Sequence, residues 1–554
     1  MTTKNIKIYG YEPPGSFSFF NVDLNRLGLT VLGTILSQKG YEVKLYCQRL
    51  SQKTKDEFLN ADYILFSLIT CTANSGYRFA DEIKYLSKKY GKRTPVLIAG
   101  GIDPTFRPEE ALEHFDYVLR GEAEASLPQL IQAIQNNESV GNIPGLSYLK
   151  DSRKINNPIG KPVENLDEIP FPDWSLMKDI PKHGILELQT SRGCPNHCKF
   201  CTVWKMFGNK VRYYSATKVF DFLNQQFSAP SFLYSANLLV KIWQKVIYNY
   251  KQLFHKTPTK IFFCDDDANL SPSFRQLLEI IRKNGWKIPW STQMTEHVFN
   301  DNKLIDLMTA TGCEMVYIGR ESLIKESLAE ANKKHNRLAP EELKEGIKKL
   351  NKKGILVYLM FVVGFDHDTK ESISYIAQFG REAGLSLIQI SILTPLPGSD
   401  DFYEMRKNNR IFDYDWRKYS GLYAVFDPKN MSAYELQKEH FKAVWSFYSW
   451  RNRWELLKVL ASSLLHYKFW WDLTKISSFW SLKVLIGQFL NKKTKIWLNL
   501  RAIKAVANLQ DRFIKIFAKR IAFKKIKEWK ALEITKNHLA FLKKRTGTYF
   551  THNI

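Results

Sequence analysis

Short apolar runs rich in β-branched residues recur along the first 135 residues, with amphipathic stretches of helical period between them. Such runs are typical of strands that are buried on both faces of a parallel sheet. Their alternation with helices predicts a doubly wound, Rossmann-like α/β sheet with right-handed crossovers. The predicted strands are 6–9, 42–46, 63–69, 95–100 and 116–120, and the clearest helices are 25–38 and 76–90.

A second alternating series follows a stretch rich in turn-forming residues. Clusters such as GNIPG and PFPDW break the periodicity between about 136 and 182, which predicts a linker. About six βα units then predict a partial (β/α)6 barrel, with its chemistry in loops at the carboxyl ends of the strands. The predicted strands are 185–189, 260–264, 288–293, 314–319, 355–364 and 387–393, separated by helices such as 271–284, 300–310 and 340–353.

From about residue 400 the strand pattern gives way to helical spacing. A chain of 554 residues is long enough for several domains. We expect a sheet domain over 1–140, a linker over 141–182, a partial barrel over 183–400 and an α-helical region over 401–554.

The positive charge is concentrated in the last part of the chain. The net charge is +26, of which +18 falls within 451–554 (23 Lys and Arg against 5 Asp and Glu). Lys and Arg alternate there with Trp, Phe and Leu, as in helices that lie at an anionic membrane surface or segments that contact nucleic acid. A solvated helical face and a Trp-rich helical cap are the structural alternatives.

Composition excludes several broad classes of protein. Hydrophobic residues make up 44% of the chain, which is enough to bury large cores and excludes wholesale disorder. No window of about 18 uncharged apolar residues predicts a membrane-spanning helix. Seven cysteines are an odd and sparse count, which favours a reducing compartment over a disulfide framework. We therefore expect a cytoplasmic protein, peripheral on the inner face of the membrane where the tail binds lipid.

Three of these cysteines fall close together, in the sequence SRGCPNHCKFC just after the first predicted barrel strand. Cys194, Cys198 and Cys201 cannot pair off as a disulfide set, but three thiolates can hold three irons of a cubane cluster. One iron then keeps an open position, where a cofactor or substrate binds. Zinc with His197 as a fourth ligand is the alternative, although this spacing is poor for a zinc finger.

The CxxxCxxC spacing after the first strand of a partial barrel resembles that of the radical S-adenosylmethionine (SAM) superfamily. The resemblance implies that the three cysteines hold a 4Fe–4S cluster whose open iron binds SAM. It also implies that one electron cleaves the SAM sulfonium and releases a 5′-deoxyadenosyl radical. Phe200 stands where this family has an aromatic residue near the adenine.

Further stretches resemble other SAM-contacting loops of this family, in the same order along the chain. FFCDDDANLSP lies where acidic residues contact the methionine amine, although such carboxylates also cap helices. YIGRES resembles the GxES loop, FVVGFDHDT a glycine-bearing strand end, and LTPLPGS (393–399) a closing loop near the adenosine. The SAM-contacting residues implied besides Phe200 are Asp265, Asp266, Glu321, Ser322 and Gly364.

The first domain resembles the cobalamin-binding domain of one branch of this superfamily over GGIDPTFRPEEALEHFDYVLRGEAEASLPQL (100–130). Glycines at strand ends let a backbone approach a ligand closely. The histidine often found in the GGxHPT stretch is Asp103 here, so bound cobalamin would lack a histidine on cobalt. A domain that binds nothing is the alternative. The implied cobalamin-contacting residues are Ser67, Thr70, Gly100, Gly101 and Gly121.

The branch with both domains includes hopanoid methylases and the anaerobic tetrapyrrole cyclase, and 399–450 resembles the extension that follows their barrels. The resemblance implies cobalamin-dependent methyl transfer to an unactivated carbon of a small apolar substrate, with a reducing electron donor as partner. Two alternatives stay open: cobalamin-linked oxidative cyclisation of a tetrapyrrole-like substrate, and a nucleic-acid-binding protein that uses the basic tail. The sequence identifies no catalytic acid or base.

Overall fold

The computed structural model describes residues 6–13, 27–47, 50–179, 185–227, 260–333, 336 and 338–448. These residues belong to two compact units. The first holds the residues up to Val357 together with Leu393–Asp427, and the second holds Tyr358–Ile392 together with the residues from Pro428 onward. The basic, Trp-rich tail over 451–554 lies outside the described residues.

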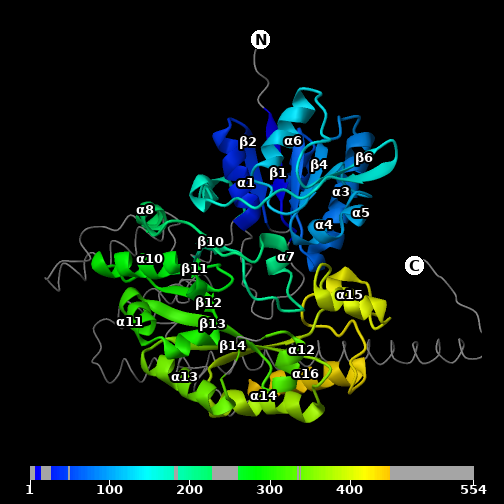
Figure 1. Ribbon diagram of the computed structural model, residues 1–554. Helices are drawn as coiled ribbons and strands as arrows, with labels where there is room; N and C mark the ends of the chain where they lie inside the picture. The colour runs from blue at the N-terminus through cyan, green and yellow to red at the C-terminus, as the bar shows by residue number, and fades with distance from the viewer. Residues whose placement is uncertain are drawn as a thin grey trace, which may run out of the picture. The chain divides into compact units, whose positions relative to one another are not determined.

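The first unit opens with the doubly wound sheet that the hydrophobic pattern predicts, drawn in blue and cyan in Figure 1. Its seven strands lie in the order β2-β1-β3-β4-β5-β6-β7, and the first five are parallel. All five strands predicted from the sequence are present close to their expected bounds. The strands are β1 (Lys7–Tyr11), β2 (Glu42–Tyr46), β3 (Tyr63–Ser67), β4 (Val96–Gly100), β5 (Tyr117–Leu119), β6 (Leu146–Lys150) and β7 (Arg153–Asn156).

Helices cover both faces of this sheet and bury two separate apolar clusters. Leu36 of α1 and Leu130 of α6 belong to one cluster, and Phe58 of α2 and Ile83 of α3 belong to the other. Burial on both faces explains why the strands are continuous apolar runs rather than alternating ones. The helices are α1 (Leu27–Gln38), α2 (Gln52–Phe58), the one-turn η1 (Thr70–Thr72), α3 (Ala73–Lys89), α4 (Ile102–Phe106), α5 (Pro108–Ala111) and α6 (Ser126–Gln135).

Part of the predicted linker is folded, contrary to the expectation from its turn-rich composition. Strands β6 and β7 form an antiparallel hairpin that extends the sheet beyond β5. Asp151 and Ser152 at its tip have φ values of 49° and 62°, and positive φ at both positions is the mark of a type I′ turn, whose twist suits a two-residue hairpin. The sheet therefore continues past residue 140. The one-turn helices η2 (Leu166–Glu168) and η3 (Trp174–Leu176) follow it.

The parallel strands of the second predicted series are all present, alternating with helices as in a partial barrel. In the first unit, β8 (Ile185–Leu188), β11 (Lys260–Phe263), β12 (Trp290–Met294) and β13 (Cys313–Glu321) pair in parallel in that order. The intervening helices are α8 (Ala216–Phe227), η5 (Ala268–Leu270), α10 (Pro272–Lys283), η6 (Glu296–Asn300), α11 (Asn302–Thr311), α12 (Lys325–Glu330) and α13 (Pro340–Lys352).

Strand β14 (Leu356–Val363) begins in the first unit and continues in the second, where it pairs in parallel with β15 (Leu387–Ile392). Helix α14 (Lys370–Glu382) connects these two strands. Helix α16 (Ala433–Phe447) also belongs to the second unit, and the Tyr448 hydroxyl that follows it donates to the Ile388 carbonyl oxygen of β15 (2.6 Å). The predicted helical extension is thus only partly helical among the described residues, because an isolated antiparallel bridge joins Ile411 and Phe426 in the stretch before α16.

Between β15 and α16 the chain returns to the first unit as α15 (Asp400–Lys407) and the one-turn η7 (Trp416–Lys418). Among the described residues, none of the helices combines the length and the apolar composition that crossing a lipid bilayer requires.

Candidate active site

The three cysteines lie on a loop whose two ends are held together directly after β8. Ser191–Arg192 (β9) and Arg212–Tyr213 (β10) pair as a short antiparallel ladder that brackets residues 193–211. Gly193 begins this cysteine loop with a φ of 94°, and a Cβ at that position would collide with the Lys210 carbonyl oxygen. Helix α7 (Val203–Phe207) lies within the loop. The sequence did not predict the ladder, which fixes where the loop starts and ends.

One of the three cysteines of this loop is buried, and the other two are partly buried. Cys198 is 5% exposed. Burial raises the pKa of Cys194, raises that of Cys198 to about 11 and raises that of Cys201 to about 12. A negative charge on Cys194 would raise the last two values further, which places the thiols in one neighbourhood. Cysteine thiols release their protons when they bind iron, and the resulting thiolates are the ligands of iron–sulfur clusters. These three cysteines therefore fit such a cluster.

The loop is not arranged around a single metal ion. No group of three or more His, Cys, Asp or Glu side chains in the described part of the chain is placed to hold one ion. The His197 ring instead packs against the Trp204 ring, with the centroids 4.6 Å apart. Thiolates that each bind a different iron stand around a cluster rather than converge on a point. His197, the fourth ligand of the zinc alternative, contacts Trp204 in this structure.

Three consecutive aspartates follow β11 and have different surroundings. Asp265 is fully buried, and its Oδ1 accepts from two backbone N–H groups after β8, those of Thr190 (2.7 Å) and Ser191 (2.6 Å). Asp267 accepts from two backbone N–H groups through Oδ1 alone. Asp266 Oδ2 and Asp267 Oδ2 are buried without any hydrogen-bond partner. Asp265 therefore organises the strand end, while its two neighbours keep oxygens that a ligand could use.

The two aspartates lie within electrostatic reach of the cysteine loop: burial is the main cause that raises the pKa of Cys194, and the charges of Asp266 and Asp267 raise it further. Burial is the main cause that raises the pKa of Asp266 to about 7, and the negative charges of Asp265 and Asp267 contribute to the same shift. A buried carboxylate oxygen without a donor is costly. A ligand ammonium placed here would supply charge-assisted hydrogen bonds. The acidic stretch that the sequence predicted for such a contact contains all three aspartates, and Asp265 and Asp266 were the two singled out; contact with SAM stays a prediction.

The GxES loop presents Glu321 at the end of β13 in a strained conformation. Its φ is 67°, a region that residues other than glycine rarely enter. Its Oε1 accepts from Lys333 Nζ (2.6 Å), and the two side chains are 9% and 11% exposed. A Cβ on Gly319 would lie 2.5 Å from the same oxygen, so glycine leaves room for this pair. Ser322 accepts through its hydroxyl from the Ile324 N–H (3.0 Å) and so caps the next turn.

Lys333 is a buried cation that the sequence did not single out. Its Nζ lies 6.0 Å from the centroid of the Phe200 ring. Burial raises the pKa of Cys198, and the positive charge of Lys333 opposes that shift. The structure thus brings Phe200, Glu321 and the thiols together around this ammonium. Lys333 stands in a polar stretch far along the chain from the cysteines, so no local sequence signal marks it.

In the second unit, Gly364 directly follows β14 with a φ of 106°. Its N–H donates to Asp368 Oδ2 (2.8 Å), and so does the N–H of Phe365 (3.1 Å). The turn is therefore built by an aspartate that accepts two backbone hydrogen bonds. Contact of Gly364 with SAM stays a prediction.

The residues predicted to contact cobalamin lie at the carboxyl ends of neighbouring strands in the first sheet. Ser67 ends β3, Gly100 ends β4, and the two are partners in the parallel register. Thr70 begins η1, just beyond β3, and is buried. Ligands of doubly wound sheets bind at this edge.

Two glycines continue this edge and are joined by a threonine hydroxyl. Gly101 and Gly121 have φ values of 99° and 76°. A Cβ on Gly101 would lie 2.6 Å from the Leu68 carbonyl oxygen, so close backbone packing requires glycine there. The Thr105 hydroxyl donates to the Gly101 carbonyl (2.8 Å) and accepts from the Gly121 N–H (3.1 Å). The loops after β4 and β5 are thereby tied together.

Asp103, at the position where the related motif often has histidine, is held inside the domain by Arg107. Arg107 Nη2 donates to both of its oxygens (2.8 Å each), and the Tyr77 hydroxyl donates to Oδ2 (3.2 Å). Asp103 is 1% exposed. Both carboxylate oxygens are occupied, so this side chain serves the fold.

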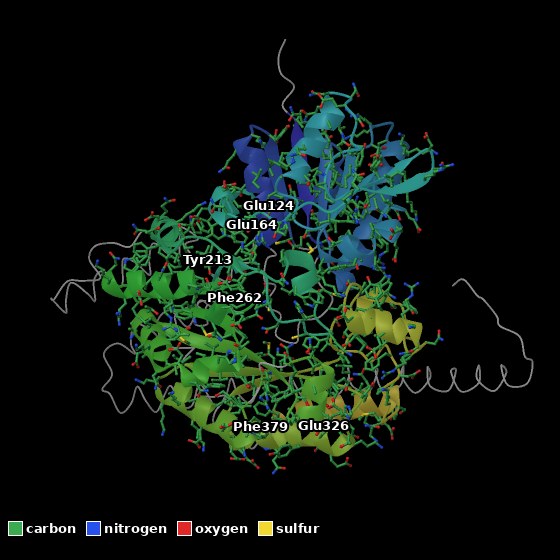
Figure 2. All side chains as sticks on the ribbon, viewed as in Figure 1. Glu124, Glu164, Tyr213, Phe262, Glu326 and Phe379 are labelled. Carbon is green, nitrogen blue, oxygen red and sulfur yellow. The ribbon has the colours of Figure 1, made fainter. Side chains whose placement is uncertain are left out.

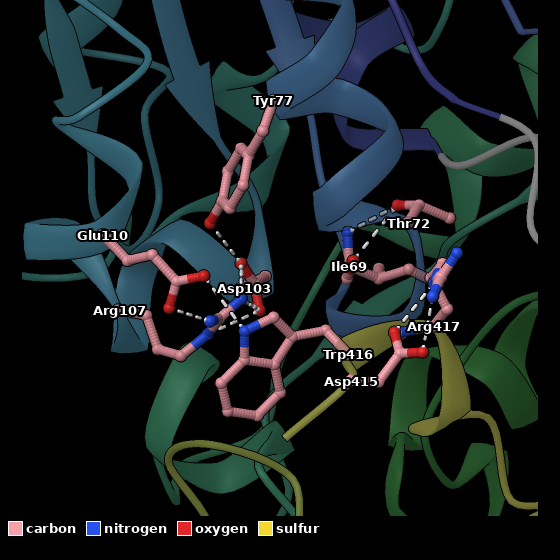
Figure 3. A network of polar contacts seen from close by, with 9 residues as sticks. All are labelled: Ile69, Thr72, Tyr77, Asp103, Arg107, Glu110, Asp415, Trp416 and Arg417. Atoms are coloured by element: carbon pink, nitrogen blue, oxygen red, sulfur yellow. Dashed lines mark hydrogen bonds and ion pairs between the residues drawn. The ribbon is translucent and has the colours of Figure 1, made fainter. Parts of the chain in front are cut away.

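The same arginine meets the segment that follows the barrel strands, as Figure 3 shows. Its guanidinium carbon lies 3.8 Å from the centroid of the Trp416 ring, within range of a cation–π interaction. Trp416 Nε1 donates to Glu110 Oε1 (3.0 Å), and Glu110 also pairs with Arg107. Residues of α4, α5 and η7 thus share one network within the first unit.

A second buried network joins the cysteine loop to the first domain. Arg192 Nη1 donates to Glu124 Oε1 (2.6 Å) and lies 3.7 Å from Glu122 Oε2. Arg212 donates to both oxygens of Glu122 (2.5 and 3.0 Å). The exposed fractions of the four side chains lie between 3% and 11%. We call these four residues the loop junction: Glu122, Glu124, Arg192 and Arg212.

Comparison with known proteins finds two family models that match this chain. Residues 188–380 match the model of the radical SAM superfamily, and residues 20–131 match the model of the B12 binding domain. The chain is 28% identical to an uncharacterized methyltransferase of Pyrococcus horikoshii over 69% of this chain and 78% of that protein. It is 25% identical to the bacteriochlorophyllide d C-12(1)-methyltransferase of Chlorobaculum tepidum over 75% of this chain and 81% of that protein.

A solved structure has a similar fold. It is the radical S-adenosylmethionine methyltransferase TsrM of Kitasatospora setae with tryptophan substrate and a SAM analogue bound. The TM-score is 0.57 at 17% identity, and the alignment covers 72% of this chain and 76% of that one. The predicted α/β fold class and the resemblance stated from the sequence are both confirmed.

Proposed function

We propose that this chain, a member of the radical SAM superfamily with a cobalamin-binding domain ahead of its barrel, methylates a carbon of a small molecule. Two of its relatives are named as methyltransferases, which favours methyl transfer over the oxidative cyclisation that the same motifs allow. The reaction would replace a hydrogen on the substrate carbon by a methyl group.

The observation that carries this proposal is the grouping of three thiols, one buried and two partly buried, with two unpartnered carboxylate oxygens on neighbouring loops. Cys194, Cys198 and Cys201 would hold the 4Fe–4S cluster. The free oxygens of Asp266 and Asp267 would accept hydrogen bonds from the amine of SAM, which supplies the donors they lack.

The other predicted residues would complete the SAM and cobalamin sites. Asp265 would act through the end of β8, which its hydrogen bonds hold in place. Lys333 would keep the Glu321 carboxylate oriented toward SAM. The residues proposed to line the SAM site besides these are Phe200, Ser322 and Gly364, and those proposed for cobalamin are Ser67, Thr70, Gly100, Gly101 and Gly121.

When bound, the cluster supplies the electron that cleaves SAM, and cobalamin supplies the carrier for the methyl group. The chain's own residues would orient these groups, and the partial burial of the thiols would limit the access of water to the reacting atoms. Overall, a substrate C–H group, two SAM molecules and two electrons from a low-potential donor give four products. These are the methylated substrate, 5′-deoxyadenosine, methionine and S-adenosylhomocysteine, so atoms and electrons balance.

For the substrate we propose a large apolar ring compound. The Chlorobaculum tepidum relative is named for methylation of bacteriochlorophyllide d, a tetrapyrrole. A tetrapyrrole or a similarly apolar molecule would suit a chain whose tail combines tryptophan with positive charge.

Metal content is the first test of this proposal. Protein purified without oxygen and supplied with cobalamin should contain about four iron atoms and about one cobalt per chain, as a 4Fe–4S cluster and one corrinoid require. Elemental analysis and the visible spectrum of one sample measure both. Protein with iron but no cobalt would remove cobalamin from the proposal and make the first domain a structural or substrate-binding remnant.

SAM labelled in its methyl group then separates methyl transfer from cyclisation. With apolar tetrapyrroles as substrates, label should enter the product, and S-adenosylhomocysteine and 5′-deoxyadenosine should form in equal amounts. A substrate that is oxidised or cyclised without taking up label would replace methyl transfer by the oxidative alternative.

We also propose that residues 451–554 bind the surface of an anionic membrane. This segment carries +18 of the net charge interleaved with aromatic residues. The full chain should sediment with vesicles containing anionic phospholipid, and a chain ending at residue 450 should not. Vesicle binding that survives this truncation, or tighter binding to RNA than to vesicles at the same salt concentration, would contradict the membrane proposal.

A further inference from the structure

All four charged side chains of the loop junction are buried. Its side chains are 3% to 11% exposed, whereas the Lys210–Glu164 pair nearby is 74% and 69% exposed. Two guanidinium groups and two carboxylates balance in charge. Each guanidinium also donates to a further acceptor: Arg192 to Gln189 (3.1 Å), and Arg212 to the Phe207 carbonyl oxygen at the end of α7 (2.9 Å).

The junction reaches both ends of the cysteine loop. Arg192 and Arg212 are register partners in the ladder that closes this loop, one just before Gly193 and the other just after residue 211. Any shift of the first domain against these arginines would therefore move both anchors of the loop together.

On its other side the junction is continuous with the loops proposed for cobalamin. Glu122 directly follows Gly121, whose N–H donates to the Thr105 hydroxyl, and that hydroxyl donates to Gly101. Hydrogen bonds from the loop after β4 to Gly121, the peptide bond to Glu122, and the ion pairs of Glu122 thus connect the loops after β4 and β5 to the cysteine loop.

Stability alone does not account for such a network. Removing charged groups from water is expensive, and a buried ion pair often contributes no more to stability than apolar residues of the same size. What it does impose is one geometry, because bidentate arginine–carboxylate contacts tolerate little displacement. The junction therefore has the properties of a device that fixes relative position.

We propose that the loop junction positions the cysteine loop against the cobalamin-binding domain, so that SAM cleavage and methyl delivery act on the same substrate atom. This inference rests on the proposed function and adds four positioning residues to it. A displacement of about 1 Å can cost about 100-fold in a reaction between positioned groups. The junction would keep the yield of methylated product per SAM cleaved high.

Glu124→Gln is the sharpest test, because it keeps the size of the side chain and removes the negative charge that pairs with Arg192. We expect its iron and cobalt contents to equal those of the wild type. The ratio of methylated product to 5′-deoxyadenosine should fall about 10- to 100-fold, since radicals would form but meet no positioned methyl donor. Hydrogen–deuterium exchange of residues 193–211 should become faster.

Glu164→Gln is the matched control, since it removes the same chemical group from an exposed ion pair that also reaches the cysteine loop; Glu124 and Glu164 are both labelled in Figure 2. Exposed pairs contribute little, so its product ratio and exchange should match the wild type. Arg192→Lys, which keeps the charge but not the forked geometry, should give an intermediate ratio.

The outcomes separate this inference from the proposed function. A wild-type protein that forms 5′-deoxyadenosine but no methylated product would defeat methyl transfer, while the exchange measurement would still test the junction. Unchanged exchange in Glu124→Gln would overturn the positioning role. A normal product ratio with faster exchange would make the junction purely structural, and loss of cobalt would make it a binding element; either result also overturns the proposal.

Discussion

Replacement of Cys201 by alanine is expected to abolish the formation of 5′-deoxyadenosine while the chain stays folded. Each of the three cysteines would supply the thiolate of one iron, so the loss of Cys201 leaves one iron of the cluster without its protein ligand. Loss of groups that merely orient a metal ligand costs about 10- to 100-fold, and loss of the ligand itself should exceed that. Iron content should fall together with SAM cleavage, measured by elemental analysis and chromatography of 5′-deoxyadenosine.

The matched control for this prediction is Cys313→Ala. Cys313 is also buried, at 6% exposure, but it begins β13 at the end of the strand opposite to Glu321. This variant should keep its iron and its SAM cleavage, with only the modest loss of stability that follows from a small cavity. Normal 5′-deoxyadenosine formation by Cys201→Ala would remove this cysteine from the cluster and with it the assignment of the triad.

The elements of the fold could be predicted where a local pattern carries the physical cause. A run such as YILFSLI is short and apolar, as strands buried on both faces of a sheet are, and turn residues bound it, so β3 was expected near its observed bounds. The β6–β7 hairpin was missed because its strands are short and half-exposed. Its turn residues, Asp151 and Ser152, also lack the glycine that usually marks a type I′ turn.

The candidate site could be predicted only as far as its parts are contiguous in the chain. The three cysteines form one short motif, so their grouping needs no knowledge of the fold. Lys333 and the loop junction depend on segments that approach one another only after folding, and an isolated lysine or arginine carries no such information. The backbone N–H groups after β8 donate to Asp265, whereas Asp267 keeps one oxygen without a partner. The sequence does not show which of the two aspartates receives these hydrogen bonds.

Replacement of Arg107 by methionine is expected to be the most destabilising single change in the first domain. It would leave Asp103, which is 1% exposed, without the guanidinium that donates to both of its oxygens, and would deprive the Trp416 ring of its cationic neighbour. Breaking a buried ion pair in this way costs about 3–5 kcal/mol. Unfolding by denaturant, followed by hydrogen exchange in α3 to α5, would measure the loss of this domain separately from the rest of the chain.

The loss of stability in Arg107→Met should depend on pH, because it depends on whether the Asp103 carboxyl is protonated. Burial already raises the pKa of this carboxyl in the folded protein, and removal of Arg107 raises it further. A group whose pKa is raised by folding stabilises the fold below its ordinary pKa of about 4 and loses that contribution as pH rises through the folded-state value. Arg107→Met should therefore be less destabilised at about pH 5 than at about pH 8.

Arg417→Met, which breaks the exposed pair with Asp415 drawn beside it in Figure 3, should change stability by no more than about 0.5 kcal/mol. The double variant Asp103→Leu/Arg107→Met should recover much of the loss, because it removes the stranded charge along with its partner. If the double variant is as unstable as Arg107→Met at both pH values, the cost lies in packing against Trp416 and not in the uncompensated carboxylate.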